Sequence, residues 1–236
     1  MIRVLVVIVA GLLSAFANAQ EGARPKLMVD FSLYPYQSSV KDDVDFTTTI
    51  NARLPGRFSY FGYVNTRGVV TDGSSDFVRS EQNLRYSMTD NLPLDANFQS
   101  VLIRGDGNDF YQLGLSWRIH DTPAWKDFFK RINLTYRMTF HLKQFSVDDN
   151  DAWAMEHFFR MTFPGISDRL YLSGFLDQAF NQDLPDNVPS HPIVAEVQLG
   201  VRMFNRFYAI GEYRINQRRV GDERNFAIGI EYKFRW

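Results

Sequence analysis

Charged residues recur at every second position along much of this sequence, between apolar residues of the opposite parity. Both signs are present in near balance at these positions, which are Asp30, Asp45, Arg53, Arg79, Glu81, Arg85, Asp95, Arg118, Arg137, Glu156, Arg160, Arg169, Asp177, Glu196, Arg202, Glu212, Arg214, Glu231, Lys233 and Arg235. Guanidinium and carboxylate groups at this density either pair across neighbouring strands or orient a polar solute in water. Aromatic residues stand on the same side of the alternation as these charges, namely Phe61, Tyr63, Phe158, Tyr171 and Phe175. The faces of such rings can stack on planar rings of a solute.

Acyl-transfer catalysis would need a nucleophile beside a base, and the sequence gives little sign of such a pair. The sequence has four histidines, His120, His141, His157 and His191. None of them stands two residues from a serine on the same strand face. We interpret His141, which shares a strand face with Thr135 and Thr139, as a residue that lines the wall of a pore rather than as a catalytic base.

Metal chemistry is equally weakly indicated, since the chain has no cysteine and no paired-histidine spacing. Asp148, Asp149 and Asp151 could ligate a divalent cation or resemble the paired carboxylates of a barrel protease, although acidic loop tips are usually solvated. We predict that the protein is not an enzyme and carries no cofactor or metal. An outer-membrane hydrolase acting on lipid or peptide is kept as an alternative.

Strands with two unlike faces must position these side chains, because strict alternation is the signature of such strands. Residues 225–236 show it best: Phe, Ile, Ile, Tyr, Phe and Trp alternate with Asn, Ala, Gly, Glu, Lys and Arg. We predict about twelve strands, an even number as in bacterial barrels. Their spans are 26–34, 44–54, 57–66, 77–88, 94–104, 109–119, 131–145, 152–163, 168–179, 193–203, 206–216 and 225–236.

The connections between these stretches alternate in length, as expected for a barrel with short periplasmic turns and longer outer loops. Residues 55–56, 89–93, 164–167 and 205 are tight turns, whereas 35–43, 68–76, 181–192 and 217–224 are longer and polar. Two connections differ: 120–130 is long on the periplasmic side and 105–108 is short on the outer side. With Trp125, Phe128 and Phe129 among charged residues, the former is interpreted as a short amphipathic turn at the inner interface.

The first residues read as a secretory leader. Met-Ile-Arg precedes an apolar run from Val4 to Phe16, and Ala17-Asn18-Ala19 supplies small residues for cleavage. The run is shorter than the roughly 20 apolar residues of a spanning helix. We predict a signal peptide at 1–19 and one barrel domain at 20–236.

Lipid is the expected environment of the apolar face. In residues 131–145 the outward set is Ile132, Leu134, Tyr136, Met138, Phe140 and Leu142, and the inward set is Asn133, Thr135, Arg137, Thr139, His141 and Lys143. A lysine or arginine facing the bilayer midplane costs about 2–4 kcal/mol, so the charged face must enclose water. An aromatic content of 15% suits interfacial belts, and a net charge of −1 argues against a nucleic-acid polymer as partner.

Parts of the chain resemble the nucleoside-specific channel (Tsx-like) family of the bacterial outer membrane. Residues 60–65, Tyr-Phe-Gly-Tyr-Val-Asn, are similar to that family's aromatic-Gly-Tyr strand, and residues 81–88 to its Glu-x-Glu-x-Arg-Phe-Ser-Ile strand. Residues 111–115 with Asp121-Thr122-Pro123 give a third similarity. This chain also resembles bacterial outer-membrane barrels in its last residue, Trp236. In those barrels a terminal Phe or Trp is a signal that the barrel-insertion machinery recognises. The resemblance implies a monomeric, twelve-stranded channel.

The sequence therefore predicts an all-β, antiparallel transmembrane barrel in the bacterial outer membrane that passes a small hydrophilic solute by passive diffusion. The resemblance implies that this solute is nucleoside-like. The residues expected to contact the solute are Phe61, Tyr63, Glu81, Asn83, Arg85, Arg118, Arg137, Glu156 and Arg160. The alternative for each of them is a structural role in a rigid wall. A closed barrel without transport, its lumen filled by ion pairs, is the corresponding alternative for the whole protein.

Overall fold

The computed structural model describes residues 27–37, 44–67, 77–104, 109–146, 151–218 and 223–235. The predicted signal peptide at 1–19, the acidic residues Asp148 and Asp149, and Trp236 lie outside these ranges. No helix in the described ranges is long and apolar enough to cross a membrane.

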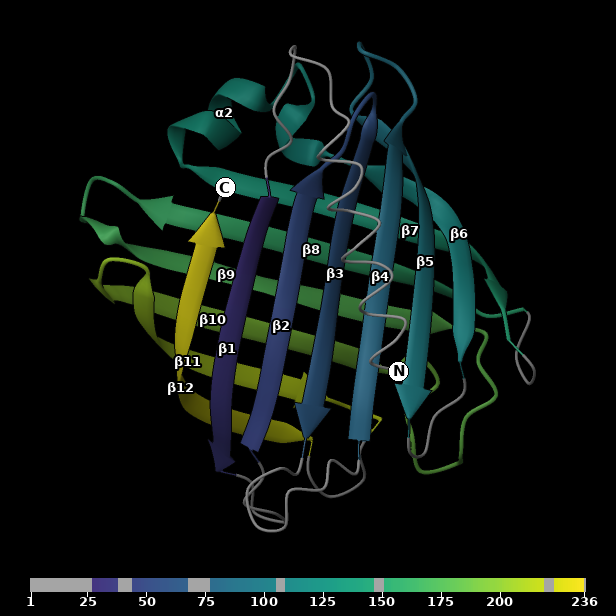
Figure 1. Ribbon diagram of the computed structural model, residues 1–236. Helices are drawn as coiled ribbons and strands as arrows, with labels where there is room; N and C mark the ends of the chain where they lie inside the picture. The colour runs from purple at the N-terminus through teal and green to yellow at the C-terminus, as the bar shows by residue number, and fades with distance from the viewer. Residues whose placement is uncertain are drawn as a thin grey trace.

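Twelve antiparallel strands close into a barrel in which each strand pairs with its neighbours in sequence and β1 pairs with β12 (Figure 1). The strands are β1 (Leu27–Gln37), β2 (Val44–Arg53), β3 (Phe58–Arg67), β4 (Phe77–Ser87), β5 (Leu94–Arg104), β6 (Phe110–Trp117), β7 (Leu134–Phe145), β8 (Trp153–Phe163), β9 (Ser167–Phe180), β10 (Ile193–Phe204), β11 (Phe207–Asn216) and β12 (Arg224–Arg235). Each overlaps one predicted stretch, which confirms the fold class and the strand number.

The two faces of the strands differ as the alternation predicts. On β12, the outward Ile228 is 66% exposed, whereas the adjacent Ala227 is 1% exposed. Glu231 and Lys233 share the inward face with Ala227 and are also buried. A wall that is apolar outside and charged inside suits a bilayer around it and water within it.

One prediction of side-chain direction is wrong. A β-bulge interrupts the pairing of β6 with β7, where Leu113 pairs with Lys143 and the adjacent Gly114 pairs with His141. The extra residue reverses the alternation beyond it, since opposed residues share a face. Lys143 therefore faces outward with Leu113, and Gln144 turns inward, where its side chain accepts a hydrogen bond from Gln112 at 2.9 Å.

Short turns gather at the end of the barrel where β1 begins and β12 ends (Figure 1). Gly56 and Asn205 adopt positive φ in two of them, a conformation that glycine and asparagine tolerate best. The longer connection at this end holds a 3-10 turn η1 (Ile119–Asp121) and the helix α2 (Lys126–Arg131). The amphipathic turn predicted there is thus helical, and β7 begins three residues later than expected, at Leu134 rather than 131.

A polar cluster ties the seam between β1 and β12 to the neighbouring wall. The Tyr171 hydroxyl donates to Glu231 and accepts from Gln198 at 2.5 Å. Lys233 lies 2.8 Å from Glu231 and 3.7 Å from Asp30, and its ammonium sits 4.1 Å from the centroid of the Tyr171 ring. The cluster joins strands β1, β9, β10 and β12.

Replacing Gly200 with alanine should destabilise the barrel by about 1–3 kcal/mol, because an added Cβ would fall on the Tyr171 ring and displace it from these partners. Urea titration in lipid vesicles measures the change. Gly211→Ala on the adjacent strand is the matched control, since no atom lies within 4 Å of its added Cβ. Equal unfolding midpoints for the two variants would contradict the prediction.

Candidate functional site

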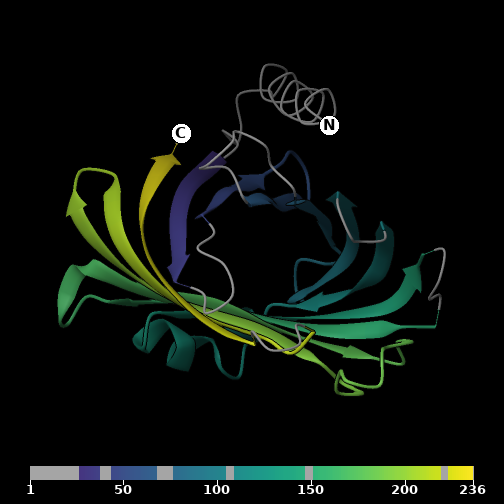
Figure 2. The ribbon, with the colours of Figure 1, turned by 90° about the horizontal axis from the view of Figure 1, so that it is seen from below.

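The lumen is narrowed where aromatic rings from two separate walls meet. The rings of Phe61 on β3 and Phe158 on β8 lie 6.4 Å apart between centroids. In the closed strand order, β4 to β7 lie between these two strands, so the contact spans the lumen rather than following the wall. Figure 2, which looks along the barrel, shows the green strands running nearly straight across one side, opposite the blue strands. We call this contact and the polar groups around it the constriction.

On the β4 side of the constriction, Glu81 is the centre of a hydrogen-bond network. Its carboxylate accepts from the Tyr63 hydroxyl at 3.1 Å, from Asn83 Nδ2 at 3.2 Å and from Gln99 Nε2 at 2.9 Å. Arg79 Nη2 lies 3.3 Å from the same carboxylate. Glu81 and its partners therefore form a rigid, pre-organised wall.

Arg85 differs from these residues in its bonding. The residue is only 6% exposed, and its guanidinium carbon lies 5.7 Å from the centroid of the Phe61 ring. Its buried Nε has no hydrogen-bond partner among the described residues. The same is true of the Nε of Arg79, but Arg79 donates to Glu81 through Nη2. The negative charges that act on it come from Glu81 and Glu156. A guanidinium held this way can donate to a passing solute.

The opposite wall carries a second set of polar groups. His141 Nε2 lies 3.2 Å from Glu156 Oε2, and both residues face the lumen. Asp177, paired with Glu156 across β8 and β9, has an Oδ1 without a hydrogen-bond partner among the described residues. The positive charge of Arg137 also acts on Glu156.

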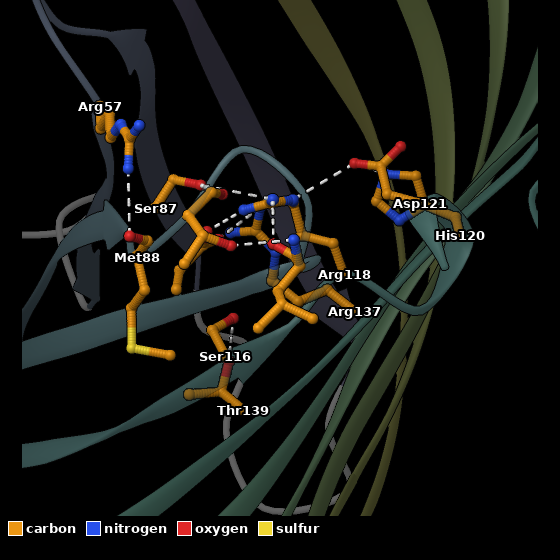
Figure 3. Close-up of polar contacts among 12 residues, drawn as sticks. Arg57, Ser87, Met88, Ser116, Arg118, His120, Asp121, Arg137 and Thr139 are labelled. Carbon is orange, nitrogen blue, oxygen red and sulfur yellow. Dashed lines mark hydrogen bonds and ion pairs between the residues drawn. The ribbon is translucent and has the colours of Figure 1, made fainter. Parts of the chain in front are cut away.

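Arg118 lies apart from the constriction, in an ion-pair network at the end with the short turns (Figure 3). Its guanidinium pairs with Asp95 and lies 3.2 Å from Asp121 Oδ2. It also donates to Ser87 Oγ at 3.4 Å. Arg137 Nη2 lies 3.9 Å from Asp95 Oδ2, so the Asp95 carboxylate forms ion pairs with two cations. These bonds occupy the Arg118 guanidinium, and they favour the structural alternative for that residue.

Arg160 also lies outside the constriction, with its guanidinium carbon 4.4 Å from the centroid of the Tyr171 ring in the seam cluster. Of the nine residues selected from the sequence, the constriction brings together Phe61, Tyr63, Glu81, Asn83, Arg85, Arg137 and Glu156. Contact of any of them with a solute stays a prediction.

Sequence reasoning missed uncharged polar residues of the site, chiefly Gln99, because the selection drew on inward charged residues and on the stretches that carry the family resemblance. Gln99 follows the same alternation as Asp95 on β5, and that signal could have identified it. His141 was recognised as a wall residue, but its pairing with Glu156 was not. Within the described ranges, no group of three or more His, Asp or Glu side chains could hold a metal ion.

Comparison with known proteins gives the fold of this chain but no family. No family model and no curated protein matches the sequence. Among solved structures, a KdgM porin is similar with a TM-score of 0.54 and 14% identity, covering 88% of this chain and 99% of that chain. A NanC porin is similar with a TM-score of 0.58 and 12% identity, covering 87% of this chain and all of that chain (100%). One KdgM structure, with a TM-score of 0.53, is a complex with disordered oligogalacturonate.

These similarities extend over nearly the whole length of the porins concerned, so the chain shares the barrel fold of these small outer-membrane porins. Together with the apolar outward face, this fold places the protein in the bacterial outer membrane.

Proposed function

We propose that the barrel is a channel for passive diffusion of a small hydrophilic solute across the outer membrane. The observation that carries the proposal is Arg85, a buried guanidinium whose Nε has no hydrogen-bond partner among the described residues and which lies over Phe61 in the constriction. Aromatic faces with a few fixed polar groups are the usual composition of a solute-selective site. The solute would move down its concentration gradient.

Two classes of solute fit the side chains of the constriction, and each has support from a similar protein. The pair formed by Phe61 and Phe158 suits a flat ring, in keeping with the nucleoside-like solute that the sequence resemblance implies. Arg85 suits a carboxylate, and oligogalacturonate, the ligand in one KdgM complex, is an anionic saccharide. We propose a nucleoside-like solute first and a short anionic saccharide second.

Liposome swelling tests the proposal. Vesicles that contain the mature protein are diluted into isotonic solutions of uncharged sugars, amino acids, nucleosides and galacturonate oligomers. A channel gives swelling that depends on solute size, and a preferred class enters faster than uncharged solutes of equal mass. Swelling no faster than in protein-free vesicles for every solute, with no current steps in planar bilayers, would overturn the proposal.

A closed structural barrel is the second candidate, and the seam cluster is the observation that favours it. Asp30, Glu231, Lys233 and Tyr171 bond to one another across the inside of the wall. If such groups fill the whole lumen, neither swelling nor current steps will be seen. The two candidates therefore differ in one measurement.

Replacing Phe61 with alanine should raise the swelling rate by about two- to threefold for solutes near the size limit, because the pore diameter at the narrowest point limits their passage. The matched control is Phe46→Ala, which removes an exposed ring from the outward face of β2. An equal rate in both variants would show that the ring pair does not limit passage.

The remaining partners follow from the same proposal. We infer that the barrel acts as a monomer, surrounded by outer-membrane lipid, and that Trp236 at the end of the chain is read by the barrel-insertion machinery. The small solute completes this set of partners.

A further inference from the structure

The segment between β6 and β7 folds onto the outside of the barrel wall. The Trp125 ring lies 5.8 Å from the Trp117 ring, and Phe129 stacks on Tyr136 at 6.4 Å between centroids. Trp117 and Tyr136 each stand next to a lumen-facing residue in their strands, so both point outward. The helix α2 is therefore held against the lipid-facing side of the wall, at the end with the short turns (Figures 1 and 2).

The surface that α2 presents is both aromatic and cationic. Trp125 is 45% exposed and Phe128 is 60% exposed, although each is large and apolar. The exposed cations Lys126, Lys130 and Arg131 stand on the same short helix, with Asp127 as its single acid. Exposed aromatic rings beside cations are typical of segments that lie in a membrane interface.

A polar pair on the outward face marks the level of the interface. The Tyr136 hydroxyl lies 2.7 Å from His157 Nδ1, and the two rings are stacked. Polar atoms at the middle of the hydrocarbon would be costly, whereas amphipathic rings are enriched at headgroup level. Tyr136 is two residues from the start of β7, so the headgroup region lies close to α2.

We propose that α2 and the adjoining outward face of β6, β7 and β8 form a binding site for an anionic phospholipid. The end with the short turns faces the periplasm, where the leaflet is phospholipid. The three cations complement a negative headgroup, while Trp125 and Phe128 enter the boundary with the acyl chains. The site lies outside the lumen and is independent of solute transport.

Native mass spectrometry of the intact mature barrel tests the proposal. The protein is purified in detergent and titrated with equimolar phosphatidylglycerol and phosphatidylcholine. Phosphatidylglycerol should be retained in preference, by about tenfold in affinity, because each cation near the headgroup strengthens the attraction. The triple variant Lys126→Gln, Lys130→Gln, Arg131→Gln should lose that preference.

The matched control neutralises three exposed arginines elsewhere at the same end, Arg57→Gln, Arg169→Gln and Arg206→Gln. It should keep the preference if α2 holds the lipid. Equal retention of the two lipids by the unaltered barrel would overturn the proposal. An equal loss of preference in the control and in the α2 variant would also overturn it, because the effect would then belong to net charge alone.

Discussion

Replacing Arg85 with alanine should shift the ion selectivity of the channel towards cations by about fivefold, which corresponds to an electrostatic change on the order of 1 kcal/mol. The buried guanidinium is the cation that lies over Phe61 in the constriction. Its loss leaves the carboxylates of Glu81, Glu156 and Asp177 less compensated. Anions would then meet a higher barrier, and cations a lower one.

Reversal potentials in planar bilayers under a salt gradient measure this shift. Arg57→Ala serves as the control, because Arg57 forms an exposed ion pair with Asp90 in the short turns, away from the lumen. The variant barrel should fold as well as the original, since the Nε of Arg85 makes no hydrogen bond in the described ranges. Unchanged selectivity in a folded Arg85→Ala barrel would remove this residue from the site.

Replacing Asp95 with alanine should lower the free energy of unfolding by about 2–3 kcal/mol, because removal of one partner leaves a largely buried charge without compensation. Asp95 is 2% exposed and forms ion pairs with both Arg118 and Arg137. Both guanidinium groups are about a fifth exposed. The expected loss is therefore smaller than for a dry core. Arg118 keeps its ion pair with Asp121, so Arg137 is the cation that loses its ion pair.

Asp90→Ala is the control, because Asp90 lies in the turn that connects β4 to β5, the strand that carries Asp95. Asp90 pairs with Arg57 at 2.7 Å, but its side chain is 80% exposed, and exposed pairs contribute about 0–1 kcal/mol. Urea titration in lipid vesicles compares the two variants. If they unfold at the same denaturant concentration, the network around Arg118 has no special role in stability.

Strand positions were predictable because alternation and turn residues are local signals. Residues 225–236 show an uninterrupted two-residue period, and β12 spans Arg224–Arg235. The bulge at Leu142, opposite Leu113 and Gly114, carries no local signal of this strength, which is why Lys143 was assigned to the wrong face. A single inserted residue reverses every later assignment along a strand.

The composition of the candidate site was partly predictable, but its assembly was not. Alternation assigned Phe61 and Phe158 to the inward face, yet nothing in either stretch indicates that their rings meet. That contact depends on the cross-section and stagger of the whole barrel. The same holds for the separation of Arg118 and Arg160 from the constriction, since both occupy the expected face.

The seam cluster bears on how the barrel closes. The last strand carries both Glu231 and Lys233, whose partners Tyr171 and Asp30 stand on β9 and β1. Until β12 meets β1, Asp30 is separated from Lys233 and must remain hydrated, and the ion pair made on closure strengthens the bonds that Lys233 already shares with Glu231. An open barrel lacks this contribution, so closure of the last strand pair is expected to be cooperative.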